Sequence, residues 1–169
     1  MKLFKPTKYY QNILSINYDA LKKEGIKYLI FDLDNTLLNI EEGHILKNYQ
    51  DKIKVLSKTF TIFIITNAPK KKLKKHLLNE IYDYYSFAIK PFKTGFNRLK
   101  KKYHLLNEEC IMIGDQLLTD ILLANRCKIK SILVDPISNK DLKITSLNRK
   151  IEQFLIKKYQ ILERGKYNE

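Results

Sequence analysis

Short apolar runs alternate along this chain with longer stretches in which apolar and polar positions are mixed. Five of the runs are rich in β-branched and aromatic residues, and we expect them to be strands: residues 26–31, 61–66, 87–89, 110–113 and 131–134. Most positions within each run are apolar, which is typical of strands buried on both faces of a parallel sheet.

The stretches between these runs predict helices, at residues 19–24, 45–57, 69–79, 94–103, 118–126 and 147–162. Gly25 follows the first of them and suits a helix C-terminus, and Pro69 begins the third, where a missing N–H costs nothing. Strands that alternate with helices favour a three-layer α/β fold with a mainly parallel sheet and right-handed crossovers. A length of 169 residues fits one such domain, 1–169, in which residues 147–169 form a C-terminal helix.

The C-terminal stretch is amphipathic, with Ile151, Leu155 and Ile161 on or near one face. We expect this face to dock on the sheet; contact with a membrane is the alternative. No apolar run approaches the ~20 residues that span a bilayer, and the first residues have no apolar signal region. Cys110 and Cys127 are too few for a disulfide framework or a cysteine-based zinc site. These features predict a cytoplasmic protein with two free, buried thiols.

The charge of the chain is strongly positive. Lys and Arg number 32 against 18 Asp and Glu, which gives a net charge of +14 and a pI near 9.6. Such a surface favours anionic partners, namely nucleic acid, acidic lipid or a phosphorylated substrate. However, 28 of the 32 are Lys, and the chain is also rich in Ile, Asn and Tyr. The codon usage of an AT-rich genome explains the same excess, and both interpretations stay open.

Polar residues follow four of the predicted strands. Since the carboxyl ends of parallel strands meet at one edge of a sheet, we expect these side chains to lie together. Their donors are hard oxygens without His or Cys, which suits Mg²⁺ as the cofactor, and a divalent cation would neutralise the crowded carboxylates. The residues are Asp32 and Asp34, Thr66 and Asn67, Lys90, and Asp115, Gln116 and Asp120.

The residue types in this set fit phosphoryl transfer. Of two aspartates at positions i and i+2, one can attack phosphorus while the other moves the proton of the leaving group. Lys90 and the Thr66 hydroxyl would neutralise the remaining phosphoryl oxygens. Any one of these acids alone is more simply explained as a helix cap or a solvated loop residue, but four acids at the strand ends are hard to obtain by chance.

The segments FDLDNTLL, Thr66-Asn67, Lys90-Pro91 and GDQLLTD resemble the four motifs of the haloacid dehalogenase (HAD) superfamily of aspartate-nucleophile phosphatases. FDLDNTLL, KPFKTGF, GDQLLTDILLANR and ILVDPI further resemble the YqeG-type phosphatases of subclass IIIA, a branch that includes phosphatidylglycerophosphate phosphatases. The resemblance covers roughly residues 3–137.

The resemblance implies a role for each matching residue. Asp32 is the nucleophile that becomes an aspartyl-phosphate, and Asp34 is the general acid and base. The metal ligands are Asp32, the backbone carbonyl of Asp34, and Asp115. Thr66, Asn67 and Lys90 bind the substrate phosphate, and Asp120 supports either the metal shell or the lysine, with Gln116 beside it.

Three positions depart from the pattern of the branch. Thr66-Asn67-Ala68 stands where the branch usually has Ser-Asn-Asn, Asn39-Ile40 where an aromatic often follows the first motif, and Ala124 where Gly usually precedes Asn-Arg. Thr66 keeps the hydroxyl, so these departures bear on the substrate and not on the reaction type.

The spacing of the motifs leaves no room for an inserted cap domain. Only 31 residues separate Asp34 from Thr66, and only 23 separate Thr66 from Lys90. An open site suits a phosphate on a bulky carrier, and a lysine cluster begins the helix after Thr66: Lys70, Lys71, Lys72, Lys74 and Lys75. Such a cluster is what an acidic membrane or a nucleic acid would favour.

Three functions are therefore weighed. The first is a phosphomonoesterase that acts on phosphatidylglycerophosphate, an anionic phospholipid, in peripheral contact with the inner face of an acidic membrane. The second is the same chemistry on a soluble or polynucleotide phosphate; the nucleic-acid version lacks a platform of stacking aromatics. The third is a catalytically idle anion-binding module, for which the complete set of acids and Lys90 has no evident use.

Overall fold

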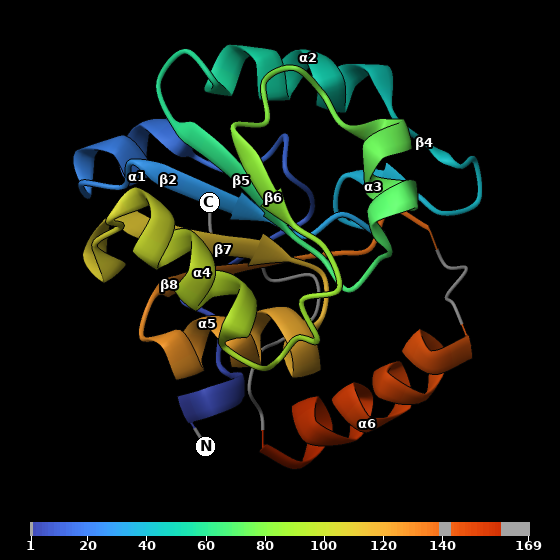
Figure 1. The fold of residues 1–169 in the computed structure, drawn as a ribbon. Coiled ribbons are helices and arrows are strands. Elements are labelled where there is room, and N and C mark those ends of the chain that lie inside the picture. Colours follow the sequence, from blue (N-terminus) through green and yellow to red (C-terminus); the bar gives the residue numbers. More distant parts are fainter. Residues whose placement is uncertain (1, 139–142, 160–169) are drawn as a thin grey trace.

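Strand β2 (Tyr28–Phe31) occupies the interior of a six-stranded parallel sheet, where Leu29, Ile30 and Phe31 are buried on both faces. The computed structural model describes residues 2–138 and 143–159 (Figure 1). Across the sheet the strands follow the order β1 (Lys8–Tyr10), β8 (Lys130–Val134), β7 (Cys110–Gly114), β2, β5 (Thr61–Ile65) and β6 (Asp83–Tyr85). The predicted parallel α/β fold is thereby confirmed.

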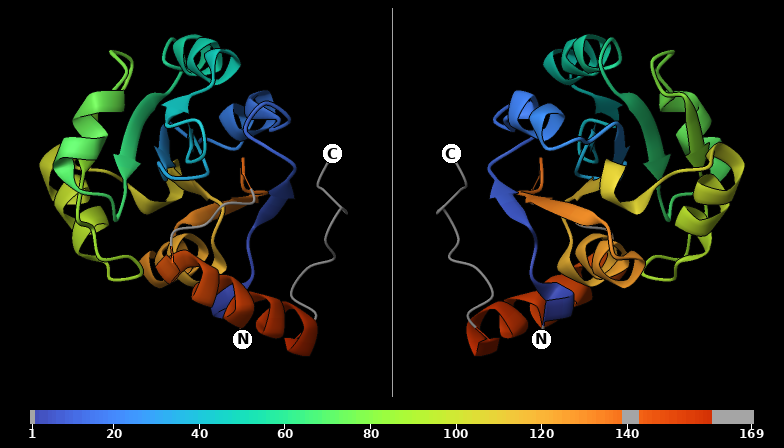
Figure 2. Two further views of the ribbon diagram at one scale, coloured as in Figure 1. Left: turned by 90° about the vertical axis from the view of Figure 1, so that its right-hand side faces the viewer. Right: turned by 90° about the vertical axis from the view of Figure 1, so that its left-hand side faces the viewer.

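Helices cover both faces of the sheet, because alternate residues of each buried strand pack against different layers (Figure 2). Phe31 belongs to the core beneath α1 (Tyr18–Lys23), α2 (Lys47–Leu56) and α3 (Lys70–His76). Ile30 belongs to the core beneath α4 (Thr94–Tyr103) and α5 (Leu122–Cys127). Burial of each such side chain stabilises the fold by about 1.5–3 kcal/mol.

The chain reverses its direction across the sheet at β2. From β2 it runs outward to β5 and β6, and it then returns past β2 to β7 and β8. In open α/β sheets, ligands bind at the carboxyl ends of the strands where the strand order reverses. The fold therefore places the candidate site just after β2 and β7.

Several short elements complete the fold. A hairpin of β3 (Leu38–Asn39) and β4 (His44–Ile45) follows β2, and 3₁₀ turns lie at η1 (Lys2–Phe4) and η2 (Asn107–Glu109). A π-helical turn, η3 (Leu117–Ile121), precedes α5. The sequence pattern missed β1, the hairpin and the π turn because each is too short to show a periodicity.

One predicted strand is wrong. Residues 87–89 are irregular, and the strand of this region is β6 (Asp83–Tyr85), four residues earlier. β6 is a half-buried edge strand with an Asp and two Tyr, so its sequence does not look like a buried strand. Phe87 and Ile89 adopt positive φ angles of 49° and 51°, which a strand does not contain.

The C-terminal helix α6 (Lys143–Tyr159) begins four residues before the predicted start, and residues 160–169, including Ile161, lie outside the described residues. Ile156 packs against a cluster of Leu117 and Ile121 from the π turn and Tyr9 and Leu133 from the sheet. Glu152 is buried there and accepts a hydrogen bond of 2.9 Å from the Leu118 N–H. Ile151, on the face predicted to dock, is 42% exposed. None of the described helices has the length and apolarity needed to cross a membrane.

The two cysteines are free and buried, as predicted. Burial raises the pKa of the Cys110 thiol to about 12 and that of the Cys127 thiol to about 11. Both thiols are therefore protonated at neutral pH and unreactive as nucleophiles.

Candidate active site

The polar residues predicted from the strand ends meet at one edge of the sheet. Asp32 directly follows β2, Thr66 follows β5, and Asp115 follows β7. Lys90 comes from the segment between β6 and α4, because the strand expected before it does not form. The Asp32 N–H extends the ladder between β2 and β7 by donating to the Ile113 carbonyl at 2.9 Å.

A tight turn after β2 separates the two aspartates of the first motif. The N–H groups of Leu37 and Leu38 both donate to the Leu33 carbonyl, and Asn35 has a φ of 60°. Asn tolerates this left-handed conformation better than most residues. The turn leaves Asp32 buried, whereas the Asp34 side chain is 16% exposed at the rim of the site.

Lys90 lies between two buried carboxylates. Its Nζ is 2.5 Å from Asp32 Oδ1 and 2.7 Å from Asp120 Oδ1, and its side chain is only 2% exposed. Burial by itself would lower the pKa of Lys90, but the carboxylates of Asp120 and Asp32 outweigh that effect and raise it. Lys90 is therefore a permanently charged group in the floor of the site.

The Asn67 side chain holds the backbone of Lys90. Asn67 Oδ1 accepts a hydrogen bond of 2.6 Å from the Lys90 N–H, and Asn67 Nδ2 donates to the Lys90 carbonyl at 3.3 Å. Asn67 was predicted to bind substrate; the contacts that its side chain makes in the structure are these two with the backbone of Lys90.

Asp120 is fixed by its immediate surroundings. It is fully buried, and its Oδ2 accepts a hydrogen bond of 3.1 Å from the Gln116 N–H. Gly114 passes so close to it that an added Cβ would lie 2.3 Å from the Asp120 carboxyl carbon. The Asp120 side chain makes the predicted contact with the lysine, at 2.7 Å, and Gln116 supports Asp120 through its backbone N–H.

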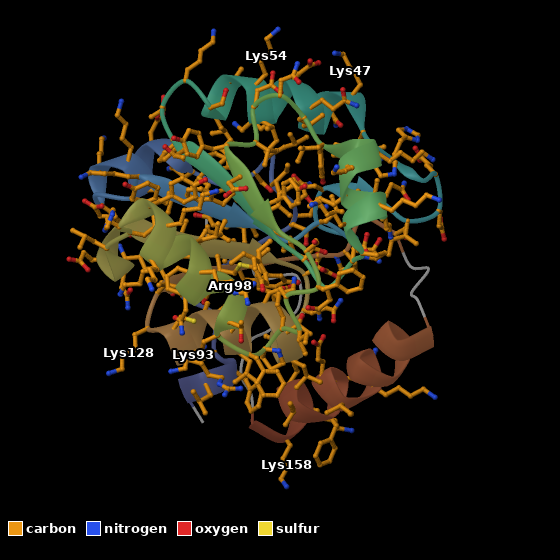
Figure 3. All side chains as sticks on the ribbon, viewed as in Figure 1. Lys47, Lys54, Lys93, Arg98, Lys128 and Lys158 are labelled. Atoms are coloured by element: carbon orange, nitrogen blue, oxygen red, sulfur yellow. The ribbon has the colours of Figure 1, made fainter. Side chains whose placement is uncertain are left out.

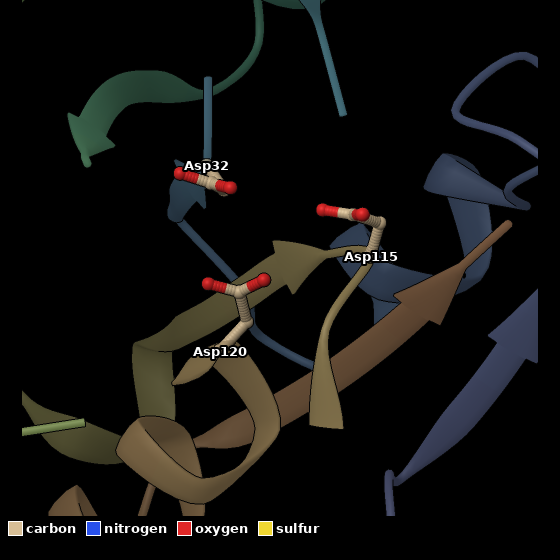
Figure 4. Close-up of side chains that lie close together, drawn as sticks. All are labelled: Asp32, Asp115 and Asp120. Carbon is tan, nitrogen blue, oxygen red and sulfur yellow. The ribbon is translucent and has the colours of Figure 1, made fainter. Parts of the chain in front are cut away.

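Asp32, Asp115 and Asp120 form a buried acidic triad, with one carboxylate oxygen of each within 4.8 Å of the others (Figure 4). Thr36, which the sequence pattern did not single out, donates a hydrogen bond of 3.2 Å to Asp115 Oδ1. Burial raises the pKa of Asp32, Lys90 opposes the rise, and the charge of Asp120 adds to it.

The charges and donors of the acidic triad fit a divalent cation. Three carboxylates face a single buried ammonium group, that of Lys90, so ionised carboxylates leave an excess of negative charge. The donors are all oxygens, the ligands that Mg²⁺ prefers. The predicted ligands Asp32 and Asp115 both belong to this triad, and the backbone carbonyl of Asp34 comes from the turn beside it.

Asp34 has a cationic neighbour, Lys72, for which the sequence pattern predicted no contact with a residue of the site. Lys72 Nζ, from α3, lies 2.7 Å from Asp34 Oδ1, and the Lys72 side chain is 29% exposed. Lys72 was predicted to belong to a basic rim with four other lysines, but it turns toward the site because the adjacent Leu73 anchors α3 in the core.

Thr66 is buried at the end of β5. Its Oγ1 accepts a hydrogen bond of 3.1 Å from the Ala68 N–H, which leaves the hydroxyl proton to be donated to a ligand. The replacement of the usual Ser by Thr therefore leaves a hydroxyl at this strand end, beside Asn67.

Comparison with known proteins identifies relatives along almost the whole chain. Residues 1–86 match the family model described as mitochondrial PGP phosphatase, and residues 88–143 match a HAD-hydrolase-like model. The chain is 35% identical over 158 residues to "Probable phosphatase YqeG" of Bacillus subtilis (strain 168), covering 92% of this chain and 91% of that protein.

Solved structures resemble the fold at low sequence identity. A predicted HAD-like family hydrolase from Porphyromonas gingivalis superposes with a TM-score of 0.59 at 15% identity, over 75% of this chain and 98% of that one. A haloacid dehalogenase-like family hydrolase from Xanthomonas campestris gives a TM-score of 0.59 at 9% identity, over 76% and 99% of the two chains.

Proposed function

Because this chain belongs to the YqeG-type phosphatases of the haloacid dehalogenase superfamily, we propose that it hydrolyses a phosphomonoester through an aspartyl-phosphate on Asp32. The observation that carries this chemistry is the contact of Asp32 with a buried lysine that a second carboxylate, Asp120, also holds. Membership of a phosphatase family argues against the idle anion-binding module.

In the first step, an Asp32 carboxylate oxygen forms a bond to phosphorus as the bond between phosphorus and the leaving oxygen breaks. Asp34, at the rim of the site, donates its proton to that leaving oxygen. In the second step, water attacks phosphorus and gives a proton to the Asp34 carboxylate. The bond between Asp32 and phosphorus then breaks, so Asp32 is regenerated and inorganic phosphate leaves.

The other residues of the site act on charge and position. Lys90 and the Thr66 hydroxyl hold the phosphoryl oxygens, and Asn67 keeps the Lys90 backbone in place. Asp32, Asp115 and the Asp34 carbonyl would hold Mg²⁺, which supplies positive charge against the phosphoryl oxygens and so reduces their repulsion of the Asp32 carboxylate.

We propose phosphatidylglycerophosphate as the substrate. Support comes from the match of residues 1–86 to the PGP phosphatase model, and from the absence of a cap. The interval from Asp34 to Thr66 contains only the β3–β4 hairpin, α2 and β5, and that from Thr66 to Lys90 contains only α3 and β6. An uncapped site admits a phosphate whose carrier stays in a bilayer.

The lysines of α3 support peripheral contact with an acidic membrane. Lys70, Lys71, Lys74 and Lys75 are exposed on a helix that begins next to the catalytic edge. A lysine near an anionic bilayer contributes about 1 kcal/mol to binding. Reversing three of these charges should lower turnover of the lipid more than turnover of a small soluble phosphomonoester, and equal losses would contradict the proposed contact.

The test of the substrate is a comparison of kcat/KM. Phosphatidylglycerophosphate in mixed micelles is measured against several soluble phosphomonoesters and 3′- or 5′-phosphorylated oligonucleotides, with the Asp32→Asn variant as the control for contaminating phosphatases. We expect the lipid to give the highest value. A higher kcat/KM for a soluble compound or an oligonucleotide would overturn the lipid assignment in favour of the second function.

A further inference from the structure

The segment that joins β6 to α4 carries large apolar side chains into solvent beside the catalytic lysine. Phe87, Ile89 and Phe92 are 61%, 66% and 56% exposed, whereas Ala88 and Lys90 between them are buried. Inward and outward positions alternate, so Ala88 packs in the core beneath α4 and Lys90 reaches into the site. We call Phe87, Ile89 and Phe92 the apolar loop patch.

The backbone makes the choice of these residues more unusual. Phe87 and Ile89 both have φ angles in the left-handed region, 49° and 51°. Bulky and β-branched residues are genuine outliers there, and Gly or Asn is the usual occupant. A loop that only positioned Lys90 would be more stable with Asn or Gly at both positions. Two large apolar side chains are thus exposed to solvent on a backbone conformation that disfavours them. The stability of the fold does not explain them, which points to a role in contact with another molecule.

Hydrogen bonds hold the patch in a fixed orientation beside α3. The Phe87 N–H donates to the Ala68 carbonyl at 3.2 Å, and the Ala88 N–H donates to the Thr66 carbonyl at 3.0 Å. Helix α3 starts two residues after Ala68, and its exposed lysines follow at once. Figure 1 shows α3 and the segment after β6 on the side toward which the strand arrows point.

Charge alone does not select a face of this molecule. Figure 3 shows labelled basic residues on widely separated elements: Lys47 and Lys54 on α2, Lys128 after α5, and Lys158 on α6. A purely electrostatic contact with an anionic surface therefore allows many orientations. The apolar loop patch adds exposed apolar area next to both the α3 lysines and the active site.

We propose that the apolar loop patch inserts into the interfacial region of an anionic lipid bilayer, while the α3 lysines contact the headgroups. Apolar side chains rimmed by lysines are the combination that binds such an interface, with a reach of about 5–10 Å into the headgroup and acyl boundary. Arg126, whose guanidinium lies 5.7 Å from the centre of the Phe92 ring, adds a further cation beside the patch. The active site then faces the membrane surface, an orientation that rests on the proposed lipid substrate.

The direct test uses the absence of tryptophan from the chain. A Phe87→Trp variant has a single tryptophan in the patch. A Val55→Trp variant has one at the end of α2, just before the start of β5 and so away from the strand ends that carry the site; Val55 is 60% exposed. On addition of vesicles of phosphatidylglycerol and phosphatidylcholine, we expect only the Phe87→Trp protein to show emission that shifts to shorter wavelength and is quenched by brominated acyl chains.

Two results of this test would overturn the proposal. One is an unchanged emission of the Phe87→Trp protein when the protein is fully bound to the vesicles, or an equal change in the Val55→Trp protein. The other is a shift to shorter wavelength that depends on protein concentration without vesicles, because the patch would then be an interface between two copies of the chain.

Vesicle sedimentation gives a second measurement. Asn is the usual non-glycine occupant of the left-handed region, so Phe87→Asn and Ile89→Asn remove apolar area without breaking the backbone. We expect the double variant to bind phosphatidylglycerol vesicles at least about tenfold more weakly than the wild type. The matched control is Val55→Asn with Leu106→Asn, two exposed apolar residues away from the site, which should leave binding unchanged. Equal losses in both double variants would contradict the proposal.

Failure of this inference and failure of the proposed function are distinguishable. If the enzyme hydrolyses phosphatidylglycerophosphate in detergent micelles but the tryptophan of the Phe87→Trp variant does not enter vesicles, the docking proposal is wrong and the substrate stands. If that tryptophan enters vesicles but the lipid is not hydrolysed by the wild type, the docking surface stands and the substrate is wrong.

Discussion

The most local test of the site geometry is the substitution Gly114→Ala. The added Cβ would lie 2.3 Å from the Asp120 carboxyl carbon, whereas real Cβ atoms essentially never approach closer than 3.0 Å. Asp120 is fully buried, so its carboxylate has to move by about 0.7 Å within a packed core. A shift of this size stretches its 2.7 Å contact with Lys90 toward the limit of a hydrogen bond.

The expected loss in kcat on a soluble phosphomonoester is about 10²-fold, because a displacement near 1 Å costs that much when catalytic groups are misplaced. Overpacking should also lower the free energy of unfolding in urea by about 1–3 kcal/mol. The matched control is Gly25→Ala, at a glycine after α1 with a φ of +82° and no atom within 4 Å of the added Cβ. It should lose about 1 kcal/mol of stability through backbone strain, with kcat unchanged. A folded Gly114→Ala enzyme whose kcat stays within about twofold of wild type would refute the reasoning.

Three further outcomes are expected. Asp32→Asn should lower turnover by more than about 10³-fold while the fold is kept. Its melting temperature should be unchanged or higher, because the repulsion among the crowded carboxylates falls. A purified variant with a tenth of wild-type activity would exclude Asp32 as nucleophile. Chelation should abolish activity and added Mg²⁺ should restore it, so full activity in excess chelator would contradict the ligand role of Asp115. Burial by itself would raise the pKa of Asp83, but its hydrogen bonds with Lys102, Tyr103 and the Tyr84 N–H outweigh that effect and lower the pKa. Ionised Asp83 therefore stabilises the fold when the pH is above the ordinary pKa of 3.8. This contribution is lost as the pH falls through the lowered pKa. The difference in unfolding free energy between wild type and Asp83→Asn should thus shrink below pH 3.8 in urea titrations, and a difference that grows there would contradict it.

The central strands and most of the site were predictable because the sequence pattern that specifies them lies within a few consecutive residues. β2 and β7 are continuous apolar runs, and a residue that follows a buried parallel strand has to lie at the sheet edge. Asp32 and Asp115 follow from that rule alone. The pairing of Lys90 with Asp120 does not follow from it, because the two residues are 30 positions apart and meet only through the packing of separate loops.

The failure at residues 87–89 has a physical cause. An apolar run next to a strand end predicts burial, because the pattern contains no information on φ. At Phe87 and Ile89 a left-handed backbone turns the apolar side chains outward, and Lys90 instead points inward. The contact between Lys72 and Asp34 was likewise hidden, because the rotation of α3 is set by the burial of Leu73 in the core.

The measurement that tests the central claim most directly is the chemical trapping of the phosphoenzyme. The wild-type enzyme is acid-quenched during turnover and treated with borohydride, which reduces an acyl phosphate of aspartate to homoserine, and the peptides are analysed by mass spectrometry. We predict homoserine at position 32 in a fraction of the protein that depends on substrate, and none in the Asp32→Asn variant. Reproducible trapping at another residue, or an active enzyme that gives no trapped residue when a known aspartyl-phosphate enzyme does under the same quench, would contradict the account.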